Sequence, residues 1–145
     1  MRAGARAGLP MLRLICAAAL LAPAIDLAAG AEAPTLPPSA KRISGAAITR
    51  LYDGKTFTFK GFTFYGVVMG EVSYDFSAGT NHGSYQLDAH QGTFDGKIRI
   101  SGDKFCYLAG YNDERCNSVY VDGADIYEVR QSGIVESVKR AAISK

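Results

Sequence analysis

The 145-residue chain has no tryptophan, only two histidines and only three cysteines. Motifs of several catalytic and cofactor-binding sites are also absent. The sequence contains no GxSxG nucleophile elbow, no GxGxxG opening a helix, no GxxxxGK[ST] phosphate loop and no EF-hand calcium loop. These absences argue against serine hydrolases of the nucleophile-elbow type, dinucleotide-dependent enzymes and P-loop nucleotidases. We therefore expect no cofactor, and the sequence favours a non-enzymatic role.

The two histidines leave one catalytic alternative open. With Asp75 and Asp88, His82 and His90 supply the side chains of a general base or of a metal site. The competing interpretation places all four on strands and loops that face solvent. We favour the second interpretation, so no metal site and no catalytic residue are expected, and a small hydrolase or lyase is the least favoured function.

An excess of charge of one sign is missing as well. Sixteen basic and fourteen acidic residues give a net charge of +2, and the two signs are interspersed along the chain. Such a surface does not attract nucleic acid or an anionic membrane. We expect no nucleic-acid partner.

The N-terminal residues 1–33 are typical of a secretory signal peptide. Three arginines precede a short apolar run over residues 14–22, and Ala31-Glu32-Ala33 fits the small-x-small cleavage pattern. The run is shorter than the ~20 residues that span a membrane. We expect cleavage, a periplasmic or secreted protein and no membrane span after cleavage.

Cleavage removes Cys16 and leaves Cys106 and Cys116 as a pair. Residues 109–114 between them are mostly polar and turn-forming, so two strands joined by that loop would bring the two cysteines opposite each other. The alternative is a redox-active or metal-binding pair, but the spacing is not CxxC and no further soft ligand lies nearby. The sequence favours a structural disulfide.

The aromatic residues indicate the fold class. All eight tyrosines and seven phenylalanines lie between Tyr52 and Tyr127, and the chain has sixteen glycines. Alternating aromatic segments with turn signals every 8–12 residues are typical of short antiparallel strands. We predict an all-β domain over residues 43–145, built as a small antiparallel barrel or sandwich of about seven or eight strands. Residues 34–42, rich in proline, form a flexible spacer before it.

One short helix is expected before the strands. Ile48, Leu51 and Tyr52 fall at positions i, i+3 and i+4, which gives a single apolar stripe. Ser44 can cap the helix, and Gly54 can end it because glycine adopts positive φ without steric cost. So short a helix is stable only if that stripe docks on the sheet.

Three local patterns predict where the sheet turns or bends. Asp95-Gly96 is a strong hairpin signal, and Gly70 is expected at a bend or bulge. Residues 134–138 fit either a last strand or the start of a short helix.

The tyrosines are the best candidates for binding a ligand. They could line a ligand mouth or a sugar-stacking face. The alternative is that a small β domain without tryptophan fills its core with phenylalanine and tyrosine, each hydroxyl reaching the rim. The candidate ligand-binding residues are Tyr74, Tyr85, Tyr107, Tyr111 and Tyr120.

Two blocks of the chain carry a family resemblance. Tyr52-Asp53-Gly54-Lys55-Thr56 precedes the aromatic strands, and a later block runs from Gly102-Asp103-Lys104-Phe105-Cys106-Tyr107 through Cys116 to Val119-Tyr120-Val121-Asp122-Gly123. This pattern resembles small secreted proteobacterial proteins, common in rhizobia, that are catalogued only as a domain of unknown function. The resemblance covers about 90 residues. It implies export, a small β fold and the disulfide, and it supplies no catalytic residues.

Two functional hypotheses follow. The first is an exported, non-enzymatic β domain that binds a small apolar or glycan ligand, in a lipocalin-like manner if the fold is a barrel. The second is a protein–protein interaction module, such as an envelope-assembly subunit or an inhibitor, that uses an exposed edge strand or the loop at residues 109–114.

Overall fold

The computed structural model describes residues 32–109 and 112–143. The expected signal peptide, residues 1–33, lies outside the described residues except for its last two positions. Nine strands and one helix are present in the described part of the chain. They are β1 (Lys41–Arg42), α1 (Gly45–Tyr52), β2 (Thr56–Thr63), β3 (Gly66–Asp75), β4 (Thr80–Leu87), β5 (His90–Ser101), β6 (Lys104–Ala109), β7 (Asp113–Asp122), β8 (Asp125–Val129) and β9 (Val135–Ala141).

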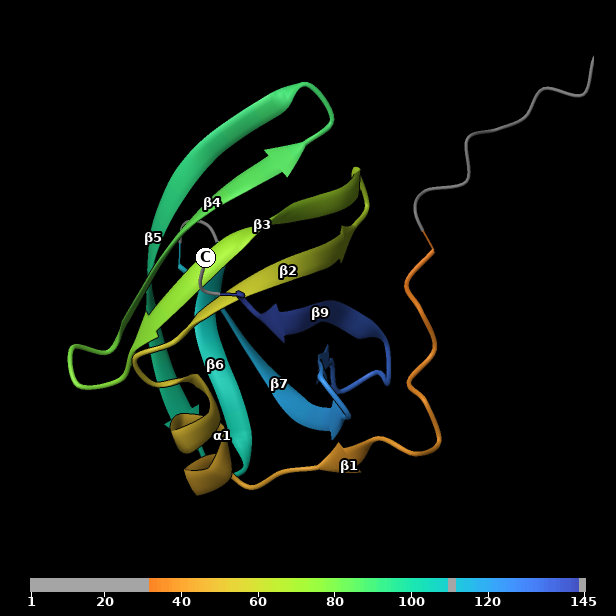
Figure 1. The fold of residues 1–145 in the computed structure, drawn as a ribbon, viewed down its shortest axis with the longest axis vertical. Coiled ribbons are helices and arrows are strands. Elements are labelled where there is room, and N and C mark those ends of the chain that lie inside the picture. Colours follow the sequence, from red (N-terminus) through yellow and green to blue (C-terminus); the bar gives the residue numbers. More distant parts are fainter. Residues whose placement is uncertain (1–31, 110–111, 144–145) are drawn as a thin grey trace, which may run out of the picture.

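Strands β2 to β9 form a closed barrel (Figure 1). Each strand pairs antiparallel with the next along the chain, and β9 returns to pair with β2. The expected all-β class is therefore confirmed, and of the two expected architectures the structure is the barrel. The additional strand β1 pairs with β7 beside the place where β6 begins.

Helix α1 closes one end of the barrel, as Figure 1 shows. Its apolar stripe docks as the sequence predicts, because Ile48 and Tyr52 are fully buried. The helix ends at Tyr52, and Gly54 follows with φ of 68°. Ser44 occupies the N-cap position, but its side chain makes no capping hydrogen bond. Burial of the stripe, rather than capping, holds this short helix.

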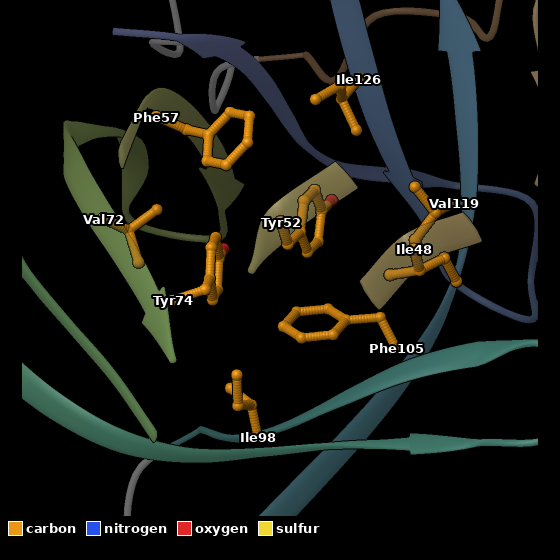
Figure 2. Packing of buried hydrophobic residues seen from close by; sticks show 9 residues of the cluster. All are labelled: Ile48, Tyr52, Phe57, Val72, Tyr74, Ile98, Phe105, Val119 and Ile126. Carbon is orange, nitrogen blue, oxygen red and sulfur yellow. The ribbon is translucent and has the colours of Figure 1, made fainter. Parts of the chain in front are cut away.

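The core beneath the helix is aromatic (Figure 2). The Tyr52 ring stacks on Tyr74 with centroids 4.8 Å apart, and it meets Phe105 and Phe57 edge-on at 5.2 and 5.3 Å. Such pairs add about 0.5–1.5 kcal/mol each to the effect of burial. The other members of this cluster are aliphatic: Ile48, Val72, Ile98, Val119 and Ile126.

The segment before α1 lies against the outer face of the barrel. Leu36 packs on a second cluster built from Tyr127, Val129 and Val135. Ser39 Oγ donates a hydrogen bond to Asp122 Oδ2 at 2.9 Å. Together with β1, these contacts join part of the expected spacer, residues 34–42, to strands β7 to β9.

Two local predictions need correction. Asp95 and Gly96 do not form a hairpin turn, because β5 runs unbroken from His90 to Ser101. The turn lies earlier, at Asp88, which has φ of 53°. Gly96 instead faces Asn81 across the β4–β5 ladder, where a Cβ atom would collide with the Asn81 side-chain oxygen. The glycine in this Asp-Gly pair permits close cross-strand packing rather than a turn.

The second correction concerns Gly70, which is predicted at a bend or bulge. It lies inside the continuous strand β3. Residues 134–138, whose sequence fits either a strand or a helix, belong mainly to strand β9.

The disulfide is present as expected. Cys106 on β6 and Cys116 on β7 are directly opposite each other and bonded. The expected connecting loop, residues 109–114, contains the hairpin tip, of which residues 110–111 lie outside the described chain. The bond therefore ties two neighbouring barrel strands close to their hairpin.

Reduction of this bond should destabilise the domain. Closing a loop of this length removes about 2.5–3 kcal/mol of unfolded-state entropy in the chain-entropy model. We expect urea denaturation with dithiothreitol to show a loss of about that size. The double variant Cys106→Ala/Cys116→Ala is the control, and its urea midpoint should not respond to the reductant. A wild-type midpoint that is unchanged by reductant would contradict the prediction.

Candidate functional site

The barrel contains a partly open cavity of about 840 Å³. Its size lies in the usual range of small-molecule sites, ~300–1,000 Å³. One wall is apolar and comes from strands β2, β3, β5 and β6. The large side chains that extend inward from that wall are Phe59, Val68, Val72, Tyr74, Phe94, Phe105 and Tyr107.

Strand alternation and glycine pairing create the apolar wall. Phe94 on β5 lies opposite Gly83 on β4, and a Cβ atom at Gly83 would come within 2.5 Å of the Phe94 ring. Phe59 on β2 lies opposite Gly70 on β3. The Phe59 and Phe94 rings then meet edge-on with centroids 6.2 Å apart. Glycines thus give these rings space to extend across the sheet.

The opposite wall is polar and comes from β7, β8 and β9. It includes Arg115, Glu128, Glu136, Ser137 and Lys139. The pairing of β8 with β9 shifts register between Glu128 and Val129, so Glu136 has no direct partner across the ladder. Because of this irregularity, two successive residues, Glu136 and Ser137, both line the cavity.

Glu128 and Lys139 form a buried ion pair, with relative exposures of 2% and 5%. The Tyr52 hydroxyl donates to Glu128 Oε1 at 2.9 Å, and the Ser137 hydroxyl donates to Oε2 at 3.1 Å. The Lys139 ammonium lies 5.7–5.9 Å from the centroids of three aromatic rings. Burial raises the pKa of Tyr52, and the negative charge of Glu128 raises it further. Tyr52 therefore stays a neutral donor to the carboxylate.

Glu136 is the centre of a second network nearer the mouth. Its Oε1 accepts hydrogen bonds from Arg115 at 2.6 Å and from Arg130 at 3.0 Å, and Oε2 accepts one from Asn117 at 2.5 Å. Burial alone would raise the pKa of Glu136, but hydrogen bonds from Asn117, Arg115 and Tyr107 outweigh it and lower the pKa. The carboxyl is held as a carboxylate.

The Tyr107 hydroxyl faces the same carboxylate. Burial raises its pKa first, and the charges of Glu128 and Glu136 add to the effect. Tyr107 thus serves as a neutral hydrogen-bond donor in the cavity. Both carboxylates already have several partners, so the polar wall is a fixed arrangement of dipoles and charges, suited to orienting a bound molecule rather than to exchanging protons.

The candidate tyrosines are distributed over different parts of the barrel. Tyr74 and Tyr107 line the main cavity. Tyr85 lines a smaller one of about 580 Å³ over strands β3 to β5. Tyr120 packs with the second cluster on the outer face. Tyr111 lies outside the described residues. Of the four candidates in the described part of the chain, only Tyr74 and Tyr107 line the same cavity.

The histidines do not take part in either cavity. His82 Nδ1 lies 2.6 Å from Asp95 Oδ1, and both side chains are largely exposed. Asp75 instead accepts hydrogen bonds from the Ser77 hydroxyl and the Ala78 amide within its own turn. His90 is exposed where the β4–β5 hairpin turns. The proposed histidine–carboxylate pairs with Asp75 and Asp88 are therefore not the ones found.

One group of possible metal ligands occurs in the described chain, at Cys106, Glu114 and Cys116. Two of its three ligand atoms are the sulfurs of the disulfide, so they offer no thiolate to a metal.

The polar wall was missed from the sequence. A strand with alternating charged residues normally turns those residues to solvent, and Glu128, Glu136 and Lys139 follow that pattern. The only signal in the sequence is that residues of opposite charge, two acids and one base, fall on consecutive C-terminal strands. These residues can be assigned to a lumen only once the strands are known to close into a barrel.

Fold and cavity together define the class: an eight-stranded up-and-down antiparallel barrel with a partly polar lumen. Comparison with models of known protein families, with curated proteins and with solved structures found no match. Within residues 32–109 and 112–143, no helix has the length and apolar character needed to cross a membrane.

Removing one partner of the buried pair should be costly. Lys139→Met leaves Glu128 buried without its counter-ion, which typically costs about 3–5 kcal/mol. The double variant Lys139→Met/Glu128→Gln removes both charges and should recover much of that loss. Urea denaturation of the wild type, both single variants and the double variant measures the coupling. Purely additive losses would contradict a direct interaction.

The lowered pKa of Glu136 predicts an acid-dependent loss of stability. A carboxyl with a depressed folded-state pKa contributes fully above its unfolded value of 4.5 and loses that contribution as pH falls through the folded pKa. Glu136→Gln should therefore cost about 1–3 kcal/mol at pH 7, and the difference from wild type should shrink below about pH 4.5. Denaturation from pH 7 to 3 tests this, with exposed Glu71→Gln as the control. A difference that is constant with pH would refute it.

Proposed function

We propose that this protein binds a small ligand with an apolar body and a polar end in the lumen of its barrel. The observation that carries the proposal is the cavity of about 840 Å³ with aromatic side chains on one wall and paired charges on the other. An apolar body would cover Phe59, Phe94 and Phe105, from which it would displace water. The polar end would lie toward Tyr107 and Arg115.

The charges of the lumen support an uncharged or zwitterionic polar end. Glu128 is paired with Lys139, and Glu136 is shared by Arg115 and Arg130. A ligand with a strong net charge would have to compete with these pairs, which already satisfy one another. Hydroxyl, amide or carbonyl groups can instead accept or donate hydrogen bonds without breaking them.

We further propose that binding takes place outside the cytoplasm, in the periplasm or after secretion. The signal-peptide pattern of residues 1–33 supports this, and so does the Cys106–Cys116 disulfide, since such bonds persist mainly in oxidising compartments. The resemblance to small secreted proteobacterial proteins of unknown function points the same way.

Filling the lumen should abolish binding without disturbing the fold. Gly61 lines the cavity, and a Cβ atom there would lie 3.9 Å from the Val68 Cβ, an ordinary contact. Gly61→Phe therefore adds a ring to the lumen. The neighbouring Lys60 is exposed on the outer face, so Lys60→Phe is the matched control.

The probe is N-phenyl-1-naphthylamine, an uncharged apolar dye that fluoresces when shielded from water. We expect micromolar binding by the wild type and by Lys60→Phe, and at least about tenfold weaker binding by Gly61→Phe, since one ring takes up much of the apolar contact. Anionic cis-parinaric acid should bind more weakly than the neutral dye. Absence of dye binding by the wild type, or equal binding by the two variants, would contradict the proposal.

A further inference from the structure

Strand β5 has a neighbour on only one side over most of its length. Residues His90 to Lys97 pair with β4, whereas β6 pairs only with the segment from Ile98 to Ser101. Figure 1 shows the β4–β5 hairpin extending beyond the rest of the barrel. Over residues 90–96, β5 is thus an edge strand within an otherwise closed sheet.

At every second residue of this edge, the backbone amide and carbonyl point away from β4. The Ile98 amide donates to the Gly79 carbonyl, on the β4 side. Amide directions alternate along a strand, so the amides and carbonyls of Gln91, Thr93 and Asp95 point to the opposite side. No described strand pairs with β5 there. Six backbone groups are available for a further strand.

The lumen extends to the same place. Phe94 and Gly96 on β5 and Tyr107 and Leu108 on β6 all line the main cavity, on the two sides of the point where these strands separate. A strand added to β5 would turn every second side chain into the lumen, because side chains alternate between the two faces of a sheet.

The edge lacks several of the usual protections against pairing, and its charged residues Asp95 and Lys97 are exposed rather than directed into the lumen. Proteins protect exposed edges with charged side chains, proline, bulges or inward-pointing charges. Residues 90–97 contain no proline, their register with β4 is unbroken, and their inward-facing residues are Gly92, Phe94 and Gly96.

We propose that the β5 edge binds an extended segment of a partner protein, which adds a strand to the barrel and places apolar side chains in the lumen. A second copy of this chain fits less well, since its own β5 would present only one large apolar side chain, Phe94, between two glycines. This proposal goes beyond small-ligand binding, because it requires the edge in addition to the cavity.

The test uses a fluorescein-labelled peptide with apolar residues at every second position, Lys-Val-Thr-Val-Thr-Val-Thr-Val-Lys. A control peptide of the same composition, Lys-Val-Val-Thr-Thr-Thr-Val-Val-Lys, lacks the alternation. Fluorescence anisotropy should show at least tenfold tighter binding of the alternating peptide. Hydrogen exchange should show new protection at the amides of Gln91, Thr93 and Asp95.

The decisive variant is Thr93→Pro. The Thr93 amide lies on the free side, so proline removes a donor to the incoming strand without breaking a hydrogen bond to β4. We expect at least a tenfold loss of peptide binding, whereas Thr93→Val, which keeps the amide, should bind as the wild type does. N-phenyl-1-naphthylamine binding by Thr93→Pro should be unchanged, which shows an intact lumen and separates this proposal from small-ligand binding.

Three results would overturn the proposal. The first is equal binding of the two peptides, or binding of neither. The second is unchanged peptide binding by Thr93→Pro. The third is a concentration-dependent dimer in sedimentation experiments that Thr93→Pro abolishes, since a second copy would then be the occupant of the edge.

Discussion

The Tyr52 side chain joins the parts of this molecule that would otherwise be separate. It comes from the helix that closes the barrel, and its ring packs on Tyr74 and Phe105. Its hydroxyl donates to Glu128, which is the carboxylate of the buried ion pair. The same residue therefore completes the apolar core and the polar wall. Without it, α1 would lose its largest buried anchor, and Glu128 would lose a neutral donor that its burial requires.

The cost of the buried charges explains how the polar wall is built. A carboxylate removed from water is tolerated only when its oxygens are satisfied. Glu128 has an ammonium and two hydroxyls, and Glu136 has two guanidinium groups and an amide. Apolar residues of similar volume would fill the same space without the free-energy cost of burying charges, so stability alone does not account for this wall. A polar wall opposite an aromatic surface fits the proposed site for an amphipathic ligand.

The sequence predicts the fold better than it predicts the site, for a physical reason. The stripe formed by Ile48 and Tyr52, the glycine after the helix and the cysteine pair are local signals, and each is confirmed. Alternation also identifies which residues share a face of a strand. It does not tell whether a polar face meets solvent or a lumen, because this depends on how eight strands close. Glu136 lies on such a polar face, and Tyr120, a candidate ligand-binding residue by sequence, packs on the outer face of the barrel.

The other wrong predictions concern glycine. A glycine in the sequence can mark either a turn or a close contact between neighbouring strands, and the two cases look alike. Asp95-Gly96 has the composition of a tight turn, yet Gly96 is needed where the Asn81 side chain crosses its strand. Propensity favours the turn, and cross-strand packing decides against it. A turn at Asp95-Gly96 would divide β5 into two strands, so the sequence does not predict the full length of β5 or how little of it pairs with β6.

The uneven mouth of the barrel follows from those lengths and from the charges. After the turn that follows Ser101, β6 pairs with only the last four residues of β5. Strand β6 then ends at Ala109, so no part of it reaches the outer half of β5. Across the lumen, Arg115 and Arg130 both bind Glu136, so the strands of the polar wall are held together by ionic hydrogen bonds. Cohesion is thus strong between β7, β8 and β9 and absent between β6 and the outer half of β5. A barrel tied on one side and open on the other presents both a lumen and an unpaired strand at the same point, which a fully closed barrel does not.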